Sequence, residues 1–237
     1  MQKMILENLL TPRKYNHKIR IGPNSDGGYV VSENHLGKRL ISLGCENATK
    51  FEEEYLSINQ EAEVVIYDGT SSCDLALKDS RVSFHNKNVY SLSELTIDKP
   101  CMMQIDIEGS ELFLLNGQLD KLKNVEQLVM EIHFHKEEYP DFPVHGSFQE
   151  WVNLFKSLNT MFSLIHIHVN DNGIAQRRPK FFGMYDLLEL TYIKKDDTLE
   201  VEDRHFPLEN LDYPNAFRMN PSIGWWTKQT KLVMDEK

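Results

Sequence analysis

Short apolar runs alternate with helical patterns through most of this chain. The runs VVIY (64–67), MMQI (102–105) and QLVM (127–130) are apolar at both odd and even positions. Strands with two apolar faces are typical of parallel sheets that helices cover on both sides. Because strand and helix also take turns along the chain, the sequence predicts parallel βαβ units and an α/β fold.

Other segments predict structure outside this alternation. Residues 2–10 predict a helix, and residues 18–32, with turn residues between two β-forming ends, predict a hairpin. Residues 181–195 predict an antiparallel hairpin at the edge of the sheet. Residues 196–221, which combine charges, prolines and scattered aromatic residues, predict a lid or insertion.

Length and composition suit one domain over residues 1–237, since 41% of the residues are hydrophobic. Within it we expect a cap of residues 1–38 and a core of residues 39–195. No apolar stretch approaches the length of about 18 residues that a membrane span needs, and no signal-peptide cleavage site follows the N-terminus. The three cysteines show no CxxC spacing. This fits a reducing compartment and predicts a cytoplasmic protein.

Acidic residues outnumber basic ones, 36 to 26, which gives a formal net charge of -10. Such a charge repels phosphate backbones, so we expect no nucleic-acid partner. A small-molecule substrate is the expected partner. The sequence leaves the oligomeric state open, a homo-oligomer included.

Ligands of open parallel sheets bind at the carboxyl ends of the strands. The first such end contains Gly44, where the missing side chain lets the backbone approach a ligand, and the second contains Asp68, 24 positions later. An acidic residue about 20 positions after the glycine binds ribose hydroxyls in dinucleotide folds. Since the chain has no GxGxxG cradle for a pyrophosphate, the pattern favours S-adenosylmethionine over NAD.

The third and fourth strand ends carry ionisable side chains. Asp106 follows directly on the buried MMQI run, and Ser110 suits the N-cap of the next helix, with Glu111 as a favourable first-turn charge. Two later runs carry polar side chains on one face at a period of two, namely Glu131, His133 and His135, then His166, His168 and Asn170. These groups predict a pocket with general-base or metal-ligand capacity. Any single one of these histidines is about as often a satisfied core or surface residue.

Several motifs together resemble the FkbM-type class I S-adenosylmethionine-dependent methyltransferases. They are DGGYVV (26–31), SLGCEN with FEEE (42–54), YDGT (67–70), QIDIEGSE (104–111) and EIHFH (131–135). The resemblance spans about residues 18–195, and its most specific part is DIEGSE. It implies a class I methyltransferase (Rossmann-like) fold: a mostly parallel seven-stranded sheet in the order 3-2-1-4-5-7-6, with helices on both faces. The first loop departs from the family, because Gly-Cys-Glu-Asn replaces a glycine-rich version.

The resemblance also implies roles for individual residues. Gly44 would lie under the methionine part of the donor, and Asp68 would bind the ribose. The expected donor contacts are Gly44, Glu46, Asn47, Asp68, Gly69 and Asp106, and the expected substrate contacts are Glu108, Glu131 and Asn170. The hairpin adds Arg20, Asp26, Gly27 and Tyr29, which we expect to close over the donor because two adjacent glycines suggest a tight backbone requirement. A plain hairpin turn is about as probable there.

Methyl transfer to a sugar hydroxyl needs a group that removes the hydroxyl proton. Asp106 with His133, and more weakly His135 and His168, would supply a general base, or else ligands for a divalent metal ion. We favour the base and expect no metal, because oxygen-rich magnesium sites rarely use histidine. The resemblance implies an O-methyltransferase for a nucleotide-linked or capsular sugar. The alternatives are a metal-dependent hydrolase, an NAD-dependent oxidoreductase on a similar sheet, and a non-catalytic donor-binding module.

Overall fold

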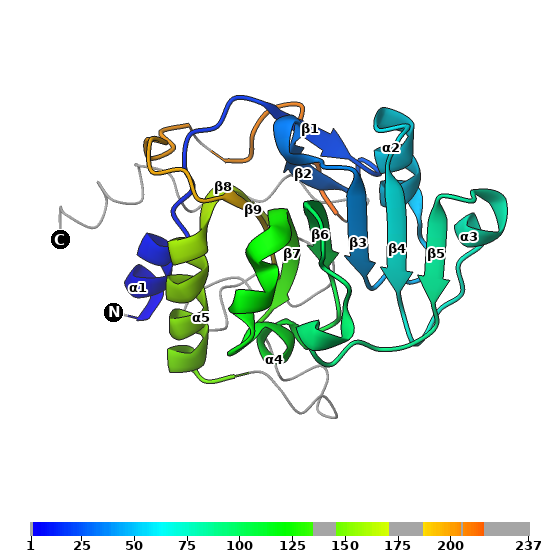
Figure 1. The fold of residues 1–237 in the computed structure, drawn as a ribbon. Coiled ribbons are helices and arrows are strands. Elements are labelled where there is room, and N and C mark those ends of the chain that lie inside the picture. Colours follow the sequence, from blue (N-terminus) through cyan, green and yellow to red (C-terminus); the bar gives the residue numbers. More distant parts are fainter. Residues whose placement is uncertain (1, 135–145, 171–186, 205, 216–237) are drawn as a thin grey trace.

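The computed structural model describes residues 2–134, 146–170, 187–204 and 206–215 (Figure 1). A seven-stranded sheet forms its centre, with the strands in the order β5-β4-β3-β6-β7-β9-β8. The strands are β3 (Arg39–Leu43), β4 (Glu63–Tyr67), β5 (Val82–His85), β6 (Cys101–Ile105), β7 (Val125–His133), β8 (Phe162–Val169) and β9 (Leu187–Lys194). Numbered from β3, this is the order 3-2-1-4-5-7-6, so the predicted fold class is confirmed.

Neighbouring strands from β5 to β7 are parallel, whereas β9 runs antiparallel to both β7 and β8. The prediction of an edge hairpin over residues 181–195 is therefore wrong: Leu187–Lys194 is one strand inside the sheet, and residues 181–186 lie outside the described residues. Strand β9 contains no glycine, proline, asparagine or aspartate that would favour a turn. It therefore stays extended and pairs along both of its edges.

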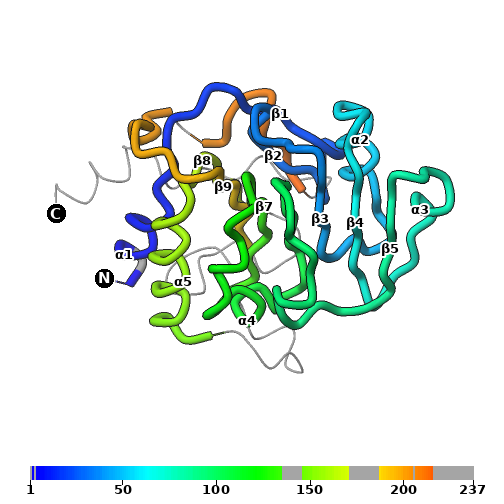
Figure 2. The backbone as a smooth tube through the Cα atoms, viewed as in Figure 1, coloured from blue at the N-terminus to red at the C-terminus, as the bar shows by residue number. Residues whose placement is uncertain are grey.

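Helices and a hairpin cover the two faces of the sheet. The helices are α1 (Gln2–Leu9), α2 (Lys50–Ile58), α3 (Leu75–Lys78), α4 (Glu111–Leu115) and α5 (Phe148–Met161), with 3₁₀ turns at Glu33–His35, Leu92–Glu94 and Leu119–Asn124. The predicted hairpin consists of β1 (Lys18–Ile21) and β2 (Tyr29–Ser32). In Figure 2, α1 lies beside α5 although the two are far apart in the sequence.

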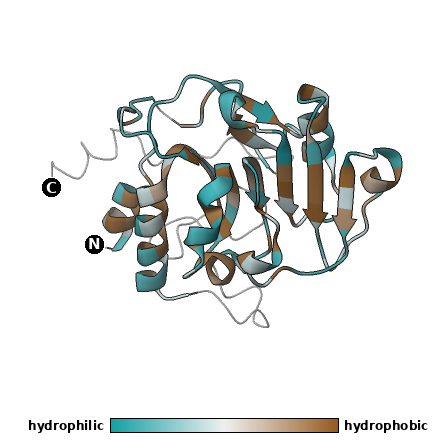
Figure 3. Ribbon diagram, viewed as in Figure 1, coloured by the Kyte–Doolittle hydropathy of each residue, from teal (hydrophilic) through white to brown (hydrophobic). Residues whose placement is uncertain are grey.

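Two hydrophobic cores form because alternate residues of a strand point to opposite faces. Met103 of β6 packs with α1, α4 and α5 on one face, and Met102 packs with α2 and the hairpin on the other. In Figure 3 the strand β4 is coloured almost entirely as hydrophobic, as a strand between two covered faces should be. No helix in the described ranges is long and apolar enough to pass through a lipid bilayer.

The hairpin covers a polar part of the second face, over β7 and β9. Gln127 of β7 accepts a hydrogen bond from the Ser32 backbone N–H at 2.6 Å, and the hydroxyl of Thr191 on β9 donates to the Val30 carbonyl. The hairpin thereby satisfies buried polar groups that an apolar helix would leave without partners. This polar part of the face continues to the carboxyl ends of the strands, where the candidate site lies.

Candidate functional site

A cavity of about 530 Å³ lies at the carboxyl ends of β3, β4 and β6. Its volume is within the range of about 300–1,000 Å³ that is typical of small-molecule sites. The predicted site residues that line it are Gly44, Glu46, Asp68, Asp106 and Glu108. The sequence analysis missed the lining residues that follow β5 and begin α4, namely Asn88, Val89, Tyr90, Ser110 and Phe113. The run VSFHN (82–86), which predicts a strand ending just before them, was the one signal in the sequence that pointed to residues 88–90.

Gly44 allows the ends of β3 and β6 to meet at the floor of this cavity. Its φ is 84°, and a Cβ atom added there would lie 1.8 Å from the carbonyl oxygen of Asp106. Any side chain would push the two strand ends apart, because the backbone of β6 cannot yield as a flexible side chain does. Position 44 therefore requires glycine for this close approach.

Asp68 joins the loops that follow β3 and β4. One carboxylate oxygen accepts the N–H groups of Cys45 and Glu46, both at 3.0 Å. The other accepts the N–H and hydroxyl of Thr70 at 2.8 Å and the N–H of Ser71 at 3.0 Å. Burial raises the pKa of Asp68, but these hydrogen bonds lower it more, and the result is a pKa well below the usual range. Asp68 is thus an ionised side chain that shapes the cavity. A ribose hydroxyl that bonded to it would have to replace one of these donors. The Thr70 hydroxyl is the one donor among them that belongs to a side chain.

Two further predicted donor contacts hold loops instead of lining the cavity. Asn47 accepts hydrogen bonds from the N–H and the hydroxyl of Ser72 through its amide oxygen. The N–H of Gly69 donates to the side chain of Asn88 at 3.1 Å. Both residues stay predictions as donor contacts.

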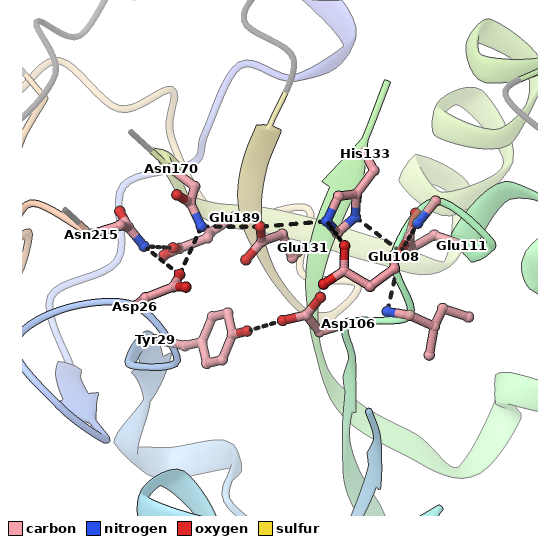
Figure 4. A network of polar contacts seen from close by, with 12 residues as sticks. Asp26, Tyr29, Asp106, Glu108, Glu111, Glu131, His133, Asn170, Glu189 and Asn215 are labelled. Carbon is pink, nitrogen blue, oxygen red and sulfur yellow. Dashed lines mark hydrogen bonds and ion pairs between the residues drawn. The ribbon is translucent and has the colours of Figure 1, made fainter. Parts of the chain in front are cut away.

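Asp106, Glu108, Glu111, Glu131 and His133 form a carboxylate–histidine group beside the cavity (Figure 4). Nδ1 of His133 lies 3.1 Å from Glu111 Oε1, and Nε2 lies 3.3 Å from Glu108 Oε2 and 3.7 Å from Glu131 Oε1. Burial lowers the pKa of His133, but the neighbouring carboxylates raise it by a larger amount. The resulting pKa is well above the usual value. The predicted proximity of Asp106, Glu108, Glu131 and His133 is present in this structure.

Glu111 holds the loop between β6 and α4 in shape. Its Oε1 accepts the N–H groups of Ile107 and Gly109 at 3.2 and 3.0 Å, and the residue is fully buried. Ser110 stands at the N-cap, as predicted, but makes no side-chain capping hydrogen bond. Glu111 is therefore more than a first-turn charge, since it orients the ring of His133.

Asp106 receives a hydrogen bond from the hydroxyl of Tyr29 at 2.8 Å. Burial and the nearby Glu108 carboxylate raise the pKa of Asp106 to about 7, although His133 and Tyr29 oppose the rise. Tyr29 thus reaches the carboxylate of Asp106 from the hairpin. Its ring packs edge-on against Phe51 of α2, which fixes its position.

A second polar group adjoins the carboxylate–histidine group, and Glu131 belongs to both. Glu131 of β7 pairs in register with Glu189 of β9. The amide of Asn170 donates to Glu131 and to Asp26, both at 3.0 Å, and the amide of Asn215 donates to Glu189 at 2.6 Å and to Asp26 at 3.3 Å. Glu189 and Asn215 were missed by the sequence analysis, because the strand that carries Glu189 was expected at the edge of the sheet.

The remaining predicted histidines lie elsewhere. Nδ1 of His168 lies 3.2 Å from Asp212, Nε2 of His166 lies 2.8 Å from the same carboxylate, and Nε2 of His168 bonds the side chain of Asn215 at 2.9 Å. These contacts attach residues 206–215, part of the predicted lid, to β8. His135 and residues 216–221 lie outside the described residues.

The hairpin residues lie over the second polar group. Arg20 donates to the carbonyls of Pro23, Ser25 and Leu211. The turn favours glycine at both positions for different reasons: at Gly28 a Cβ atom would lie 2.0 Å from the Pro23 oxygen, whereas Gly27 has open space but a left-handed φ of 77°. Among the residues that the structure describes, the cavity lining includes none of the predicted set Arg20, Asp26, Gly27 and Tyr29. Their contact with the donor stays a prediction.

A family model described as a methyltransferase FkbM domain matches residues 4–161. The chain belongs to the FkbM methyltransferase family. It is therefore an S-adenosylmethionine-dependent methyltransferase, and the family decides against the hydrolase and the NAD-dependent oxidoreductase. No curated protein matches the chain.

Solved structures with a similar fold share little sequence with this FkbM-family chain. The pyocyanin biosynthetic protein PhzM is 13% identical over 68% of this chain and 52% of its own, with a TM-score of 0.37. This chain therefore spans about half the length of PhzM. The plantazolicin methyltransferase BamL, solved with a triazolic desmethylPZN analog and SAH, is 13% identical over 69% of this chain and 79% of its own, with a TM-score of 0.42. A putative hemolysin from Streptococcus thermophilus is 12% identical over 90% and 82%, also with a TM-score of 0.42.

Proposed function

We propose that this methyltransferase acts on a hydroxyl group of a sugar, either nucleotide-linked or part of a capsular or other surface polysaccharide. The observation that carries the proposal is the carboxylate–histidine group at the rim of the cavity. Asp106 and Glu108 line the cavity and also belong to that group. A hydroxyl is a poor nucleophile, so its methylation benefits from such groups, which hold the hydroxyl and take its proton.

The residues of the cavity fit S-adenosylmethionine. The close approach at Gly44 leaves no room for a side chain, and the cavity volume is sufficient for a nucleoside. When bound, the donor supplies a methyl group on a sulfonium that is already a good leaving group. The residues of this chain then have to orient the acceptor at the Asp106 end of the cavity and accept its proton.

The cytoplasm is the compartment that we propose for this reaction. Cys45, Cys73 and Cys101 are all buried free thiols. Buried thiols that stay unpaired suit a reducing compartment. In the cytoplasm the enzyme would methylate its small-molecule acceptor before that molecule is exported or polymerised.

The test is methyl transfer from labelled donor to a panel of acceptors. The panel holds sugar nucleotides, free oligosaccharides, non-sugar alcohols and RNA, each with the purified full chain. We expect label in a sugar-containing product, located as an O-methyl ether by mass spectrometry. Label only in a non-sugar acceptor or in RNA would contradict the proposed substrate class.

A further inference from the structure

We propose that Asp106, Glu108 and His133 bind one divalent metal ion at the rim of the cavity. The sequence analysis favoured a general base without a metal. Its metal alternative, Asp106 with histidine ligands, could have included His168, but that side chain is held by Asp212 and Asn215. That the ion would also bind the acceptor hydroxyl rests on the proposed function. The binding of the ion itself does not.

The positions of the ligand atoms suit one ion. One atom from each of Asp106, Glu108 and His133 lies within 4.8 Å of the others. Nε2 of His133 and Oε2 of Glu108 are 3.3 Å apart. Adjacent ligands at metal–ligand distances of 2.0–2.3 Å stand about 3 Å apart, so little movement is needed.

The ring of His133 is oriented as a metal-binding histidine would be. Its Nδ1 faces Glu111, whose Oε1 is fixed by two backbone N–H groups. A metal-binding histidine characteristically donates its second ring N–H to such a carboxylate, which leaves the other nitrogen free for the ion. That other nitrogen, Nε2, faces carboxylate oxygens of Glu108 and Glu131. Between this nitrogen and the carboxylate oxygens there must lie either a proton, as in an imidazolium, or a bound cation. In the proposed site the metal ion takes the place of that proton.

Neighbouring groups reinforce this arrangement. Tyr29 orients the carboxylate of Asp106 through its hydroxyl. Glu111 is fully buried, and among the described residues its second oxygen, Oε2, has no hydrogen-bond partner. A buried carboxylate with an unsatisfied oxygen is expensive unless positive charge lies nearby. An ion on His133 would supply that charge.

The ligand types select the class of ion. Two carboxylates and one imidazole combine ligands that suit Mn²⁺ with one that suits Zn²⁺ or Fe²⁺, and no thiolate takes part. Because Asp106 and Glu108 line the cavity, an ion held by three protein ligands would have room there for water or a hydroxyl. Mn²⁺ is therefore the appropriate probe, since its electron paramagnetic resonance signal reports binding without any enzymatic activity.

The experiment titrates Mn²⁺ into the EDTA-treated full chain and follows the free-ion signal. We expect one bound ion per chain, at least a tenfold loss of affinity in Glu108→Gln and His133→Asn, and a 10- to 100-fold loss in Glu111→Gln. Glu61→Gln, at an exposed carboxylate paired with Lys38, should bind Mn²⁺ as the unchanged protein does. Thermal melting and binding of S-adenosylhomocysteine identify any variant that fails to fold.

Three results would overturn the metal site: no Mn²⁺ bound by the unchanged chain, unchanged affinity in a folded Glu108→Gln, or loss of binding only in Asp26→Asn. The first would leave His133 as an imidazolium, and the last would place the ion in the second polar group. Mn²⁺ binding without methyl transfer to any sugar supports the metal site and removes the proposed function. Methyl transfer to a sugar that persists in EDTA, with no Mn²⁺ bound, supports the proposed function and removes the metal site.

Discussion

At the scale of single residues, the chemistry of this site depends on how each ionisable side chain is surrounded. Asp68 and Asp106 both end a strand of the sheet, yet hydrogen bonds lower the pKa of the first while burial raises the pKa of the second to about 7. Asp68 is therefore suited to hold loops and a polar ligand, and Asp106 to meet the reacting group.

Removing the reaction-side groups should affect turnover far more than donor binding. Asp106→Ala or His133→Ala should lower the turnover rate by roughly 100-fold or more, because Asp106 lines the cavity, His133 lies beside it, and we propose that this group holds the acceptor hydroxyl. Donor affinity should stay nearly intact. Steady-state kinetics with labelled donor, with Glu61→Gln as the control, measures the first effect and calorimetry the second. Near-normal turnover in both variants would place the chemistry elsewhere.

Asp68→Ala should weaken binding of S-adenosylhomocysteine by about 1.5–3 kcal/mol, the usual contribution of hydrogen bonds to a charged group. The variant also releases the two loops that Asp68 joins. Isothermal calorimetry measures the change, and Asp74→Ala, an exposed position in the same loop region, serves as the control. Binding of NAD in place of the nucleoside would contradict the assignment.

At the scale of elements, the site depends on the strand ends of β3 and β6 staying in contact. Gly44, at the end of β3, has no room for a methyl group. Gly117 has a similar φ of 73°, but nothing lies within 4 Å of a Cβ atom added there. The two positions share the left-handed backbone and differ in the space around it. Their comparison separates the cost of backbone conformation from the cost of the clash.

Gly44→Ala should therefore lower the free energy of unfolding more than Gly117→Ala. We expect about 1 kcal/mol for the left-handed conformation in both variants. Gly44→Ala should lose a further 1–3 kcal/mol, roughly the cost of overpacking a tight site, and should also weaken donor binding. Urea unfolding measures both variants. Equal losses would show that the close approach to Asp106 contributes nothing.

At the scale of the whole molecule, buried ion pairs attach the segment after β9 to the sheet. Burial lowers the pKa of His168, but Glu189 and Asp212 raise it more, to about 9, and Asp212 has a pKa well below its usual range. The charged form of His168 therefore stabilises the folded protein. This contribution is complete below the ordinary histidine pKa of about 6.5 and disappears as the pH rises through about 9.

The unfolding free energy of the unchanged protein should accordingly fall between pH 6.5 and 9 by an amount on the order of 3 kcal/mol from this group. In His168→Gln that part of the pH dependence should be absent. Denaturant unfolding at a series of pH values measures it, and His17→Gln, at an exposed histidine, is the control. A His168→Gln profile parallel to that of the unchanged protein would disprove the role of His168.

Local sequence patterns determined a large part of this protein. The apolar runs predict the buried strands β4, β6 and β7, and the turn residues of the hairpin predict β1 and β2. The position of Asp106 at a strand end, and the shared face of Glu131 and His133, follow from the strand period of two. These features depend on residues close together in the chain, and their physical causes act over that distance.

The tertiary structure alone decided which of these groups meet. Strand β9 lies between β7 and β8, an order that the family resemblance implied and the local residue pattern did not, so Glu189 rather than His168 stands beside Glu131. Asp212, which lies far from both histidines in the sequence, contacts His166 and His168. Such pairings result from burying charges against each other at the lowest total cost, which the whole fold sets. A local pattern shows that a side chain is polar and on one face, but it contains no information on which distant partner will neutralise it.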